Sequence, residues 1–322
     1  NMLDKNMLFS STEGYFGNGV YDSTKKYPLY NSEKFYKKIK KKYKGTKLLK
    51  KGFPEIWDFE FISVHNCIIH SSAVVERELI NWDFSIFDEG FFTLPEDGRI
   101  YRDWKEGGHG NTNLFKAITQ SSNTYFFDLA YRSNINELNQ HLLSLGFGEI
   151  TCIDCFDEDK VFVPDQSWKM NMHNFGWFKG DTVNMGVGQG YLVSTPIQLA
   201  KYAYIIANKG KYFDLSIKKD LIKESKQIQF NKFTNDDWYK LHEAMVNVIE
   251  GNTGTAKGLK GTKNFIVAAK TGTAELISIE NREQFFKNDL DDNLKDHALI
   301  IAFGPMPDPT YAVSVVVENG ES

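Results

Sequence analysis

The sequence has few cysteines, no long apolar run and almost no net charge. Among 322 residues there are three cysteines, and 38 basic against 42 acidic side chains leave a formal net charge of -4. Three cysteines are too few for a disulfide scaffold. A chain this close to neutrality has no global field that attracts polyanions, so we expect no nucleic-acid partner. The sequence contains no apolar run of 18 residues, and we expect this chain to be soluble, without a membrane anchor.

Two of the cysteines are close together in the sequence. Cys152-Ile-Asp-Cys155 has the C-x-x-C spacing of zinc ribbons and redox centres. A zinc ion would need a second pair of ligands, and none is spaced to supply it. We therefore expect structural thiols or a local bridge.

The composition changes near residue 70. Residues 34–51 hold ten lysines interleaved with apolar side chains. Such a stretch could lie on an anionic membrane or bind phosphates, but a solvated helix or a disordered segment is the simpler interpretation. We divide the chain into a divergent lysine-rich segment, residues 1–70, and an enzyme-like domain, residues 71–322.

The second part has helical periodicity followed by strand-like runs. Its spacing predicts helices at 113–131, 135–145, 195–207 and 238–249, and the end of a helix at 73–80. It predicts strands at 91–94, 99–102, 265–273, 297–303 and 311–317. Strands that follow one another directly favour an antiparallel sheet packed against helices, an α+β fold.

Two short strings carry residues suited to catalysis. Lys270-Thr-Gly-Thr273 ends an apolar run, so a cation and two hydroxyls lie beside backbone that a substrate can approach closely. Ser121-Ser-Asn123 lies in a helical context and could project a hydroxyl and an amide into one cleft. A simple helix N-cap is the alternative for the second string.

Together, in this order and about 150 residues apart, the strings resemble the S-x-N and K-T-G signatures of penicillin-binding proteins and serine β-lactamases. Blocks over residues 73–320 resemble the elongation-type class B penicillin-binding proteins, the penicillin-binding protein 2 group. These blocks include Ile86-Phe-Asp-Glu-Gly90, Tyr101-Arg-Asp-Trp-Lys105, Gly107-Gly-His-Gly110, Gly180-Asp-Thr182, Gly186-Val-Gly-Gln-Gly-Tyr191 and Thr195-Pro-Ile-Gln198.

The resemblance implies a penicillin-binding, β-lactamase-like transpeptidase fold and a serine acyl transfer on D-Ala-D-Ala stem peptides and β-lactams. By position, Ser121 would relay a proton to the leaving amine, Asn123 would hold the substrate amide, and Lys270 would set the local field. Thr271 and Thr273 would bind the substrate carboxylate, the N–H of Thr273 would donate to the oxyanion, and Gly272 would keep the strand open. A serine β-lactamase and an inert binding module are the alternatives.

The S-x-x-K motif that should supply the acylated serine is not readable. Ser63 lies at about the expected distance before Ser121, but Asn66 follows where a lysine is needed, and asparagine cannot act as a base. Two S-x-x-K strings begin at Ser23 and Ser216; the first lies far from Ser121 and the second follows S-x-N. Ser63 is kept as a candidate position.

The resemblance also bears on metal, partners and location. The chemistry requires no cofactor, and Asp88, Asp103 and His109 are the residue types of a possible structural zinc site. Expected partners are a lipid-linked glycan polymerase and rod-shape scaffold proteins, at the periplasmic face of the inner membrane in the parent protein. Family members continue beyond the strand at 311–317 into a helix, so we expect domain 71–322 to be truncated before its last helix.

Overall fold

The structure of the protein is a computed structural model. It describes residues 8–11, 61–62, 66–155, 158, 162–218, 224–262, 264–274 and 296–320. Ser23, Ser63 and the lysine-rich stretch 34–51 lie outside these residues, and the division near residue 70 stays a prediction. Within the described ranges, no helix is both long and apolar enough to cross a bilayer.

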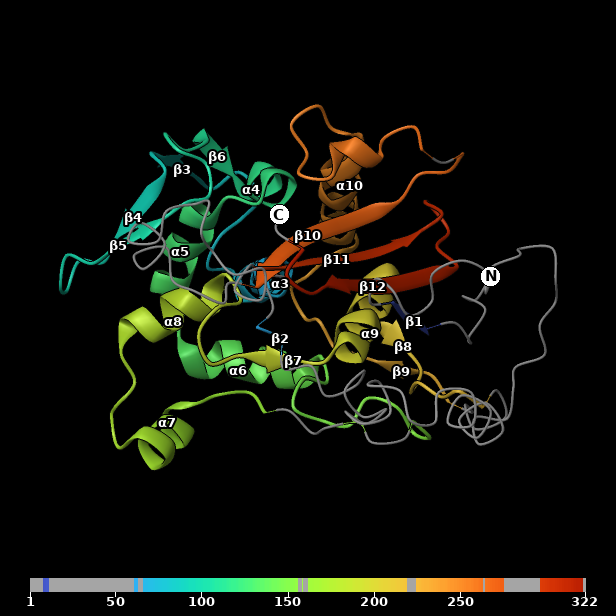
Figure 1. Ribbon diagram of the computed structural model, residues 1–322, viewed down its shortest axis with the longest axis horizontal. Helices are drawn as coiled ribbons and strands as arrows, with labels where there is room; N and C mark the ends of the chain where they lie inside the picture. Colours follow the sequence, from blue (N-terminus) through green and yellow to red (C-terminus); the bar gives the residue numbers. More distant parts are fainter. Residues whose placement is uncertain are drawn as a thin grey trace.

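A four-stranded sheet forms the centre of the molecule (Figure 1). Strands β10 (Ala268–Ala274), β11 (His297–Gly304) and β12 (Tyr311–Val317) are antiparallel neighbours, and β1 (Leu8–Ser11) pairs in parallel with β12. Among the residues that the structure describes, the order β1-β12-β11-β10 leaves β10 at the edge of the sheet. The predicted antiparallel sheet is confirmed, and the last strand has its predicted bounds.

Two helices pack against this sheet. Helix α9 (Pro196–Ala207) contacts β11 and β12, and α10 (Asn235–Glu250) contacts β10. The buried His242 of α10 joins them, because its Nε2 donates to the carbonyl of Ile206 in α9 at 2.9 Å and its ring lies 5.2 Å from that of Phe303 in β11. The two helices therefore form one layer over the sheet.

Helix α10 begins earlier than the apolar spacing predicts. Thr234 is the N-cap, and it forms a capping box with Asp237: each side chain accepts the backbone N–H of the other residue. This arrangement satisfies donors that would otherwise be orphaned at the helix start. The first turn is thus set by polar caps, which hydrophobic periodicity does not register.

A second group of helices lies beside the sheet (Figure 1). It consists of α3 (Asn66–Glu76), α4 (Leu114–Gln120), α5 (Asn123–Arg132), α6 (Ile135–Ser144) and α8 (Lys179–Gly186), with the short α7 (Gln166–His173) at its margin. Helix α5 packs closely on α8, since a Cβ placed on Gly186 would lie 2.3 Å from that of Ala130. Helix α3 ends at Glu76 rather than at residue 80, because Glu78 turns into the left-handed region at φ 56°.

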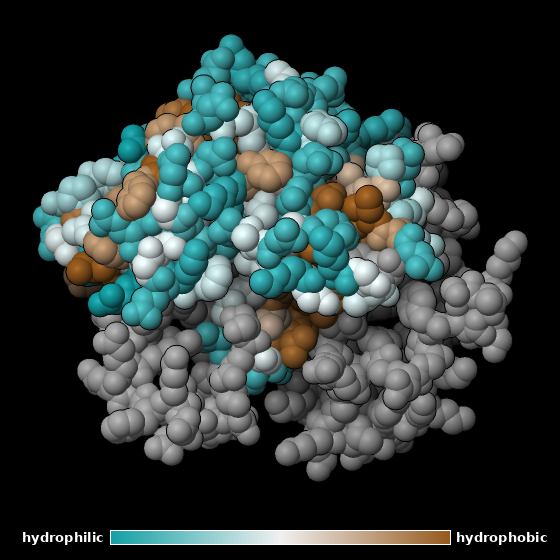
Figure 2. All heavy atoms as spheres, turned by 90° about the horizontal axis from the view of Figure 1, so that it is seen from above, coloured by the Kyte–Doolittle hydropathy of each residue, from teal (hydrophilic) through white to brown (hydrophobic). Residues whose placement is uncertain are grey.

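Short strand pairs complete the fold. They are β3 (Ser85–Asp88) with β6 (Gly110–Asn113), β4 (Phe91–Thr93) with β5 (Ile100–Arg102), β2 (Phe61–Ile62) with β7 (Val193–Ser194), and β8 (Lys211–Tyr212) with β9 (Lys226–Gln227). Seen from above, the coloured residues, those that the structure describes, present mostly hydrophilic side chains with separated hydrophobic groups (Figure 2).

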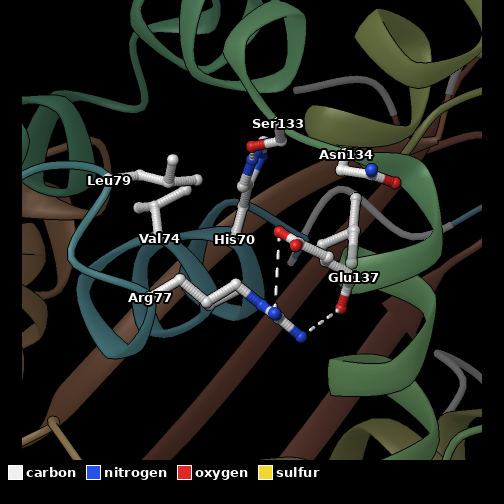
Figure 3. A pocket seen from close by; sticks show the side chains of 9 residues that line it. His70, Val74, Arg77, Leu79, Ser133, Asn134 and Glu137 are labelled. Atoms are coloured by element: carbon white, nitrogen blue, oxygen red, sulfur yellow. Dashed lines mark hydrogen bonds and ion pairs between the residues drawn. The ribbon is translucent and has the colours of Figure 1, made fainter.

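Two buried histidines tie α3 to its neighbours. His70 Nε2 lies 2.8 Å from Ser133 Oγ, beside a cavity of about 10 Å³ that Arg77 and Glu137 border (Figure 3). His141 Nε2 lies 2.8 Å from Ser72 Oγ. Burial lowers the pKa of His70 to about 4 and that of His141 to about 3, the latter helped by the nearby charge of Arg77. Both side chains are therefore neutral in the folded protein at neutral pH.

The buried histidines predict an acid-sensitive fold. Below pH 6.5 the unfolded chain binds protons at both positions while the folded protein does not, so stability falls as the pH falls until the folded pKa values are reached. The expected slope is about 3 kcal/mol per pH unit between roughly pH 6.5 and 4. Urea unfolding at several pH values measures it. The double variant H70Q/H141Q should have a flatter slope, and an unchanged slope would contradict this account.

Candidate active site

A break between two helices positions Ser121. Helix α4 ends at Gln120, and Ser121 is its C-cap, with φ 56° and ψ 45° and a backbone N–H that donates to the carbonyl of Ala117. Ser122 is the N-cap of α5, and its Oγ accepts the N–H of Tyr125 at 3.2 Å. The single helix predicted over 113–131 is therefore two helices. The N-cap alternative applies to Ser122, which leaves the hydroxyl of Ser121 outside the capping.

Lys270 reaches Ser121 from the edge strand. Its side chain is fully buried, and Nζ donates to Ser121 Oγ and to the carbonyl of Thr271, both at 2.7 Å. Burial lowers the pKa of Lys270, and the neighbouring Cys67 acts in the opposite direction. The structure thus brings together the two strings that the sequence places 149 residues apart.

The rest of the K-T-G-T string lies along the open edge of β10. Gln189 Nε2 donates to the carbonyl of Thr273 at 3.2 Å, so that carbonyl points away from β11. In a strand the N–H and C=O of one residue point to the same side, and alternate residues share a direction. The N–H groups of Thr271 and Thr273 therefore face the open edge, where both residues are partly exposed while Gly272 is buried.

Two neighbouring groups frame this edge. Thr271 Oγ1 lies 2.7 Å from Thr255 Oγ1, in the segment that follows α10. The exposed Trp104 donates its Nε1 to the carbonyl of Ser121 at 3.0 Å. Trp104 and Gln189 had no predicted role, although both lie within the sequence blocks that carry the resemblance. Asn123, the first residue of α5, is half-buried beside Ser121.

Asp88, Asp103 and His109 form a buried cluster behind the start of α5. Their potential ligand atoms all lie within 4.8 Å of one another. His109 Nδ1 is 2.8 Å from Asp88 Oδ2, which also accepts from Ser122 Oγ at 2.7 Å. Asp103 accepts the N–H of Thr124 at 2.9 Å. Although burial alone raises the pKa of Asp88, hydrogen bonds from His109 and Ser122 outweigh it and lower that pKa.

This cluster does not fit a zinc site well. Both carboxylates already accept hydrogen bonds within the protein, Asp88 from Ser122 Oγ at 2.7 Å and Asp103 from the N–H of Thr124 at 2.9 Å, and Ser122 is the middle residue of S-x-N. These hydrogen bonds hold β3 and the segment between β5 and β6 against the beginning of α5. The structural zinc allowed by the sequence is not supported by this geometry.

A cysteine, Cys67, lies at the start of α3, next to the position where an S-x-x-K motif beginning at Ser63 would have its lysine. Ser63 lies outside the described residues, and Asn66 begins α3. Cys67, at the next position, is 4% exposed and lies against Lys270. Burial raises the pKa of its thiol, and the charge of Lys270 works against that rise. Sequence reasoning missed Cys67, because only the fold brings it next to Lys270.

The remaining sequence candidates have local roles. Cys152 and Cys155 form a disulfide, which agrees with the local bridge expected for them. The hydroxyl of Ser216 donates to the carbonyl of Lys218 and accepts its N–H, so it closes a short turn. Neither feature contributes a side chain to the Ser121–Lys270 contact.

Comparison with known proteins assigns the family. The profile described as "Penicillin binding protein transpeptidase domain" matches residues 68–322. The chain belongs to the penicillin-binding protein transpeptidase domain family, with the mixed helix-and-sheet fold that the sequence predicted.

Particular relatives carry the name of a peptidoglycan D,D-transpeptidase. Peptidoglycan D,D-transpeptidase MrdA of Acinetobacter baumannii is 36% identical over 251 residues, 75% of this chain and 37% of the relative. MrdA of Escherichia coli K12 is 30% identical over 256 residues, 77% of this chain and 40% of the relative. The chain therefore spans well under half the length of these relatives.

Solved structures agree with this grouping. Helicobacter pylori PBP2, in a complex with MreC, matches with a TM-score of 0.73 and 30% identity over 81% of this chain and 46% of that chain. Pseudomonas aeruginosa PBP2, in complex with WCK 5153, matches with a TM-score of 0.68 and 30% identity over 81% of this chain and 56% of that chain.

The hydrogen bonds of Ser122 at the helix break predict how one substitution changes stability. Ser122→Ala removes the cap of α5 and the donor to buried Asp88, so the free energy of unfolding should fall by about 2 kcal/mol. Ser144→Ala removes an exposed hydroxyl bonded only to its own helix and should be nearly neutral. Urea unfolding of both variants measures the difference. Equal free energies of unfolding for the two variants would show that the hydrogen bonds of Ser122 do not stabilise the fold.

Proposed function

We propose that this domain is a peptidoglycan D,D-transpeptidase of cell-wall elongation, acylated by D-Ala-D-Ala stem peptides and by β-lactams. The observation that carries the proposal is the contact of Lys270 Nζ with Ser121 Oγ at 2.7 Å, beside an open strand edge. Membership of the transpeptidase family and the MrdA relatives support the same reaction.

The site offers a distinct group for each part of the substrate. An extended stem peptide can lie along the edge of β10, with its terminal carboxylate at the hydroxyls of Thr271 and Thr273. Asn123 holds the substrate amide, and the outward N–H of Thr273 donates to the oxyanion that forms on the attacked carbonyl. The acyl group then passes to an amine of a neighbouring stem.

A catalytically inert binding module is the second candidate. It is favoured by one observation: the first turn of α3 presents the thiol of Cys67, not a lysine, to Lys270. Such a module would keep the recognition edge of β10 and bind the same ligands without forming a covalent bond. A serine β-lactamase would form the bond and release it quickly.

Partners and location follow from the relatives rather than from the site. Helicobacter pylori PBP2 forms a complex with MreC, and we propose a scaffold protein of that kind as a partner of the whole protein. A lipid-linked glycan polymerase and the periplasmic face of the inner membrane complete the proposal, in keeping with the elongation subgroup.

Labelling with a fluorescent penicillin tests the proposed reaction. The unmodified chain should carry a stable label, and Lys270→Met should lower the labelling rate at least about 100-fold because it removes the cation at the hydroxyl. Lys240→Ala, which removes an exposed lysine paired with Asp236 on α10, is the matched control and should label normally. Rapid loss of label would favour a β-lactamase, and no label at all would favour the inert module.

The role of Thr273 predicts a dependence on the ligand carboxylate. Thr273→Val keeps the shape but removes a hydroxyl, and it should slow labelling by a free-acid penicillin about 10-fold, the effect of one hydrogen bond to a charge. The penicillin methyl ester should label the parent chain slowly and Thr273→Val no more slowly. If the substitution affects acid and ester equally, Thr273 does not bind the carboxylate.

A further inference from the structure

Two carbonyls that β10 presents at its open edge are already bonded to side chains of the protein. The carbonyl of Thr271 accepts Lys270 Nζ at 2.7 Å, and that of Thr273 accepts Gln189 Nε2 at 3.2 Å. Unpaired backbone groups on an edge strand invite pairing with other chains, and native proteins cover such edges. Lys270 is held at the same time by Ser121. Of the two donors, Gln189 is therefore the one that can leave without disturbing the contact of Lys270 with Ser121.

A substrate strand along β10 needs the carbonyl that Gln189 occupies. In a hydrogen-bonded antiparallel pair, two opposite residues exchange both bonds, each N–H donating to the carbonyl of the other residue. The proposed function gives the N–H of Thr273 to the oxyanion that forms on the penultimate D-Ala. By the same pairing, the N–H of that D-Ala meets the carbonyl of Thr273. The Gln189 amide therefore bonds in the free protein where a substrate N–H bonds in the complex.

The backbone of Gln189 is held in place, so its side chain is the part that can yield. Its N–H donates to the carbonyl of Asn184 in α8 at 3.0 Å. Tyr191, two residues further along, has its ring 5.1 Å from that of Trp168 and 6.4 Å from that of Trp177. Gln189 is partly exposed, and side chains at a surface change rotamer within picoseconds to nanoseconds. A substrate can thus displace the amide without moving the loop.

We propose that Gln189 is a specificity-determining residue that occupies the Thr273 carbonyl until a substrate N–H takes its place; this rests on the proposed transpeptidase function. Its bond satisfies the edge acceptor before the substrate binds. It also sets how strongly the site distinguishes ligands that have an N–H at this position from ligands that lack one. The exchange involves no covalent step, since one N–H···O hydrogen bond replaces another.

This exchange makes the parent chain discriminate weakly for the substrate N–H. A ligand with the N–H gains a hydrogen bond to Thr273 and releases the one from Gln189. A ligand without the N–H leaves the Gln189 bond in place, so the carbonyl is satisfied in both complexes. If the side-chain amide is removed, the second ligand covers a carbonyl that has no donor, and burial of an unsatisfied acceptor is costly. Loss of the amide should therefore sharpen the discrimination.

Two β-lactams that differ at this position test the proposal. A penicillin carries an acylamino N–H on the carbon next to the attacked carbonyl, whereas a carbapenem carries a hydroxyethyl group there. Gln189→Met keeps the length of the side chain but removes the donor. It should raise the ratio of the penicillin to the carbapenem acylation rate constant about 5- to 10-fold, the effect of one hydrogen bond. The exposed Gln229→Met is the matched control and should leave the ratio unchanged.

The ratio separates specificity from a merely structural role. General damage to the site would lower both rate constants together and leave their ratio unchanged. An unchanged or lower ratio in Gln189→Met, with both drugs still acylating the chain, would overturn the role of Gln189 and leave the transpeptidase function standing. Circular dichroism of both variants establishes that they are folded.

A binding measurement decides the role of Gln189 if neither drug acylates the parent chain, an outcome in which the proposed function fails. Calorimetry then compares an N-acylated D-Ala-D-Ala peptide with the analogue in which oxygen replaces the penultimate N–H. Gln189→Met should widen the ratio of their affinities about 5- to 10-fold. Equal ratios in the parent chain and in the variant would overturn the inference.

Discussion

The site depends on one buried amine that an edge strand delivers to a gap between helices. An ammonium group removed from water is costly unless polar partners replace its hydration, and Lys270 has Ser121 Oγ and the carbonyl of Thr271 for this purpose. A shift of β10 by one residue would turn Lys270 to the opposite face of the sheet. The register of β10 on β11, with Lys270 opposite Ile301, is therefore a condition of the chemistry as well as of the fold.

The site depends equally on the helix break that positions Ser121 opposite Lys270. It is fixed from behind, because Ser122 bonds to Asp88 and the N–H of Thr124 bonds to Asp103. These two carboxylates come from the segment 85–113, which also packs Leu94 and Tyr101 into the core. Their contribution is to hold the start of α5 so that the Ser121 hydroxyl meets an amine arriving from a distant part of the chain.

The sequence predicted the parts of this arrangement that depend on local pattern. An apolar, strand-like run placed the strand at 311–317, and the Lys270 and Ser121 strings were found by their resemblance to the K-T-G and S-x-N signatures. The break at Ser121 was missed because serine is compatible with helical periodicity, and the left-handed backbone there is enforced by Ala117 and Trp104. The contact of Cys67 with Lys270 was missed because it joins elements that only tertiary packing brings together.

Cys67 affects the electrostatics of the amine that it packs against. A second lysine at that place would add a like charge, which by itself disfavours protonation of Lys270. The thiol supplies no such repulsion and acts to raise the pKa of Lys270, so loss of hydration is left as the cause that lowers it. The basicity of Lys270 is then tied to how dry the site is. Because the side chain is already fully buried in the folded protein, this lowering depends on the packing of β10 against the helix break at Ser121.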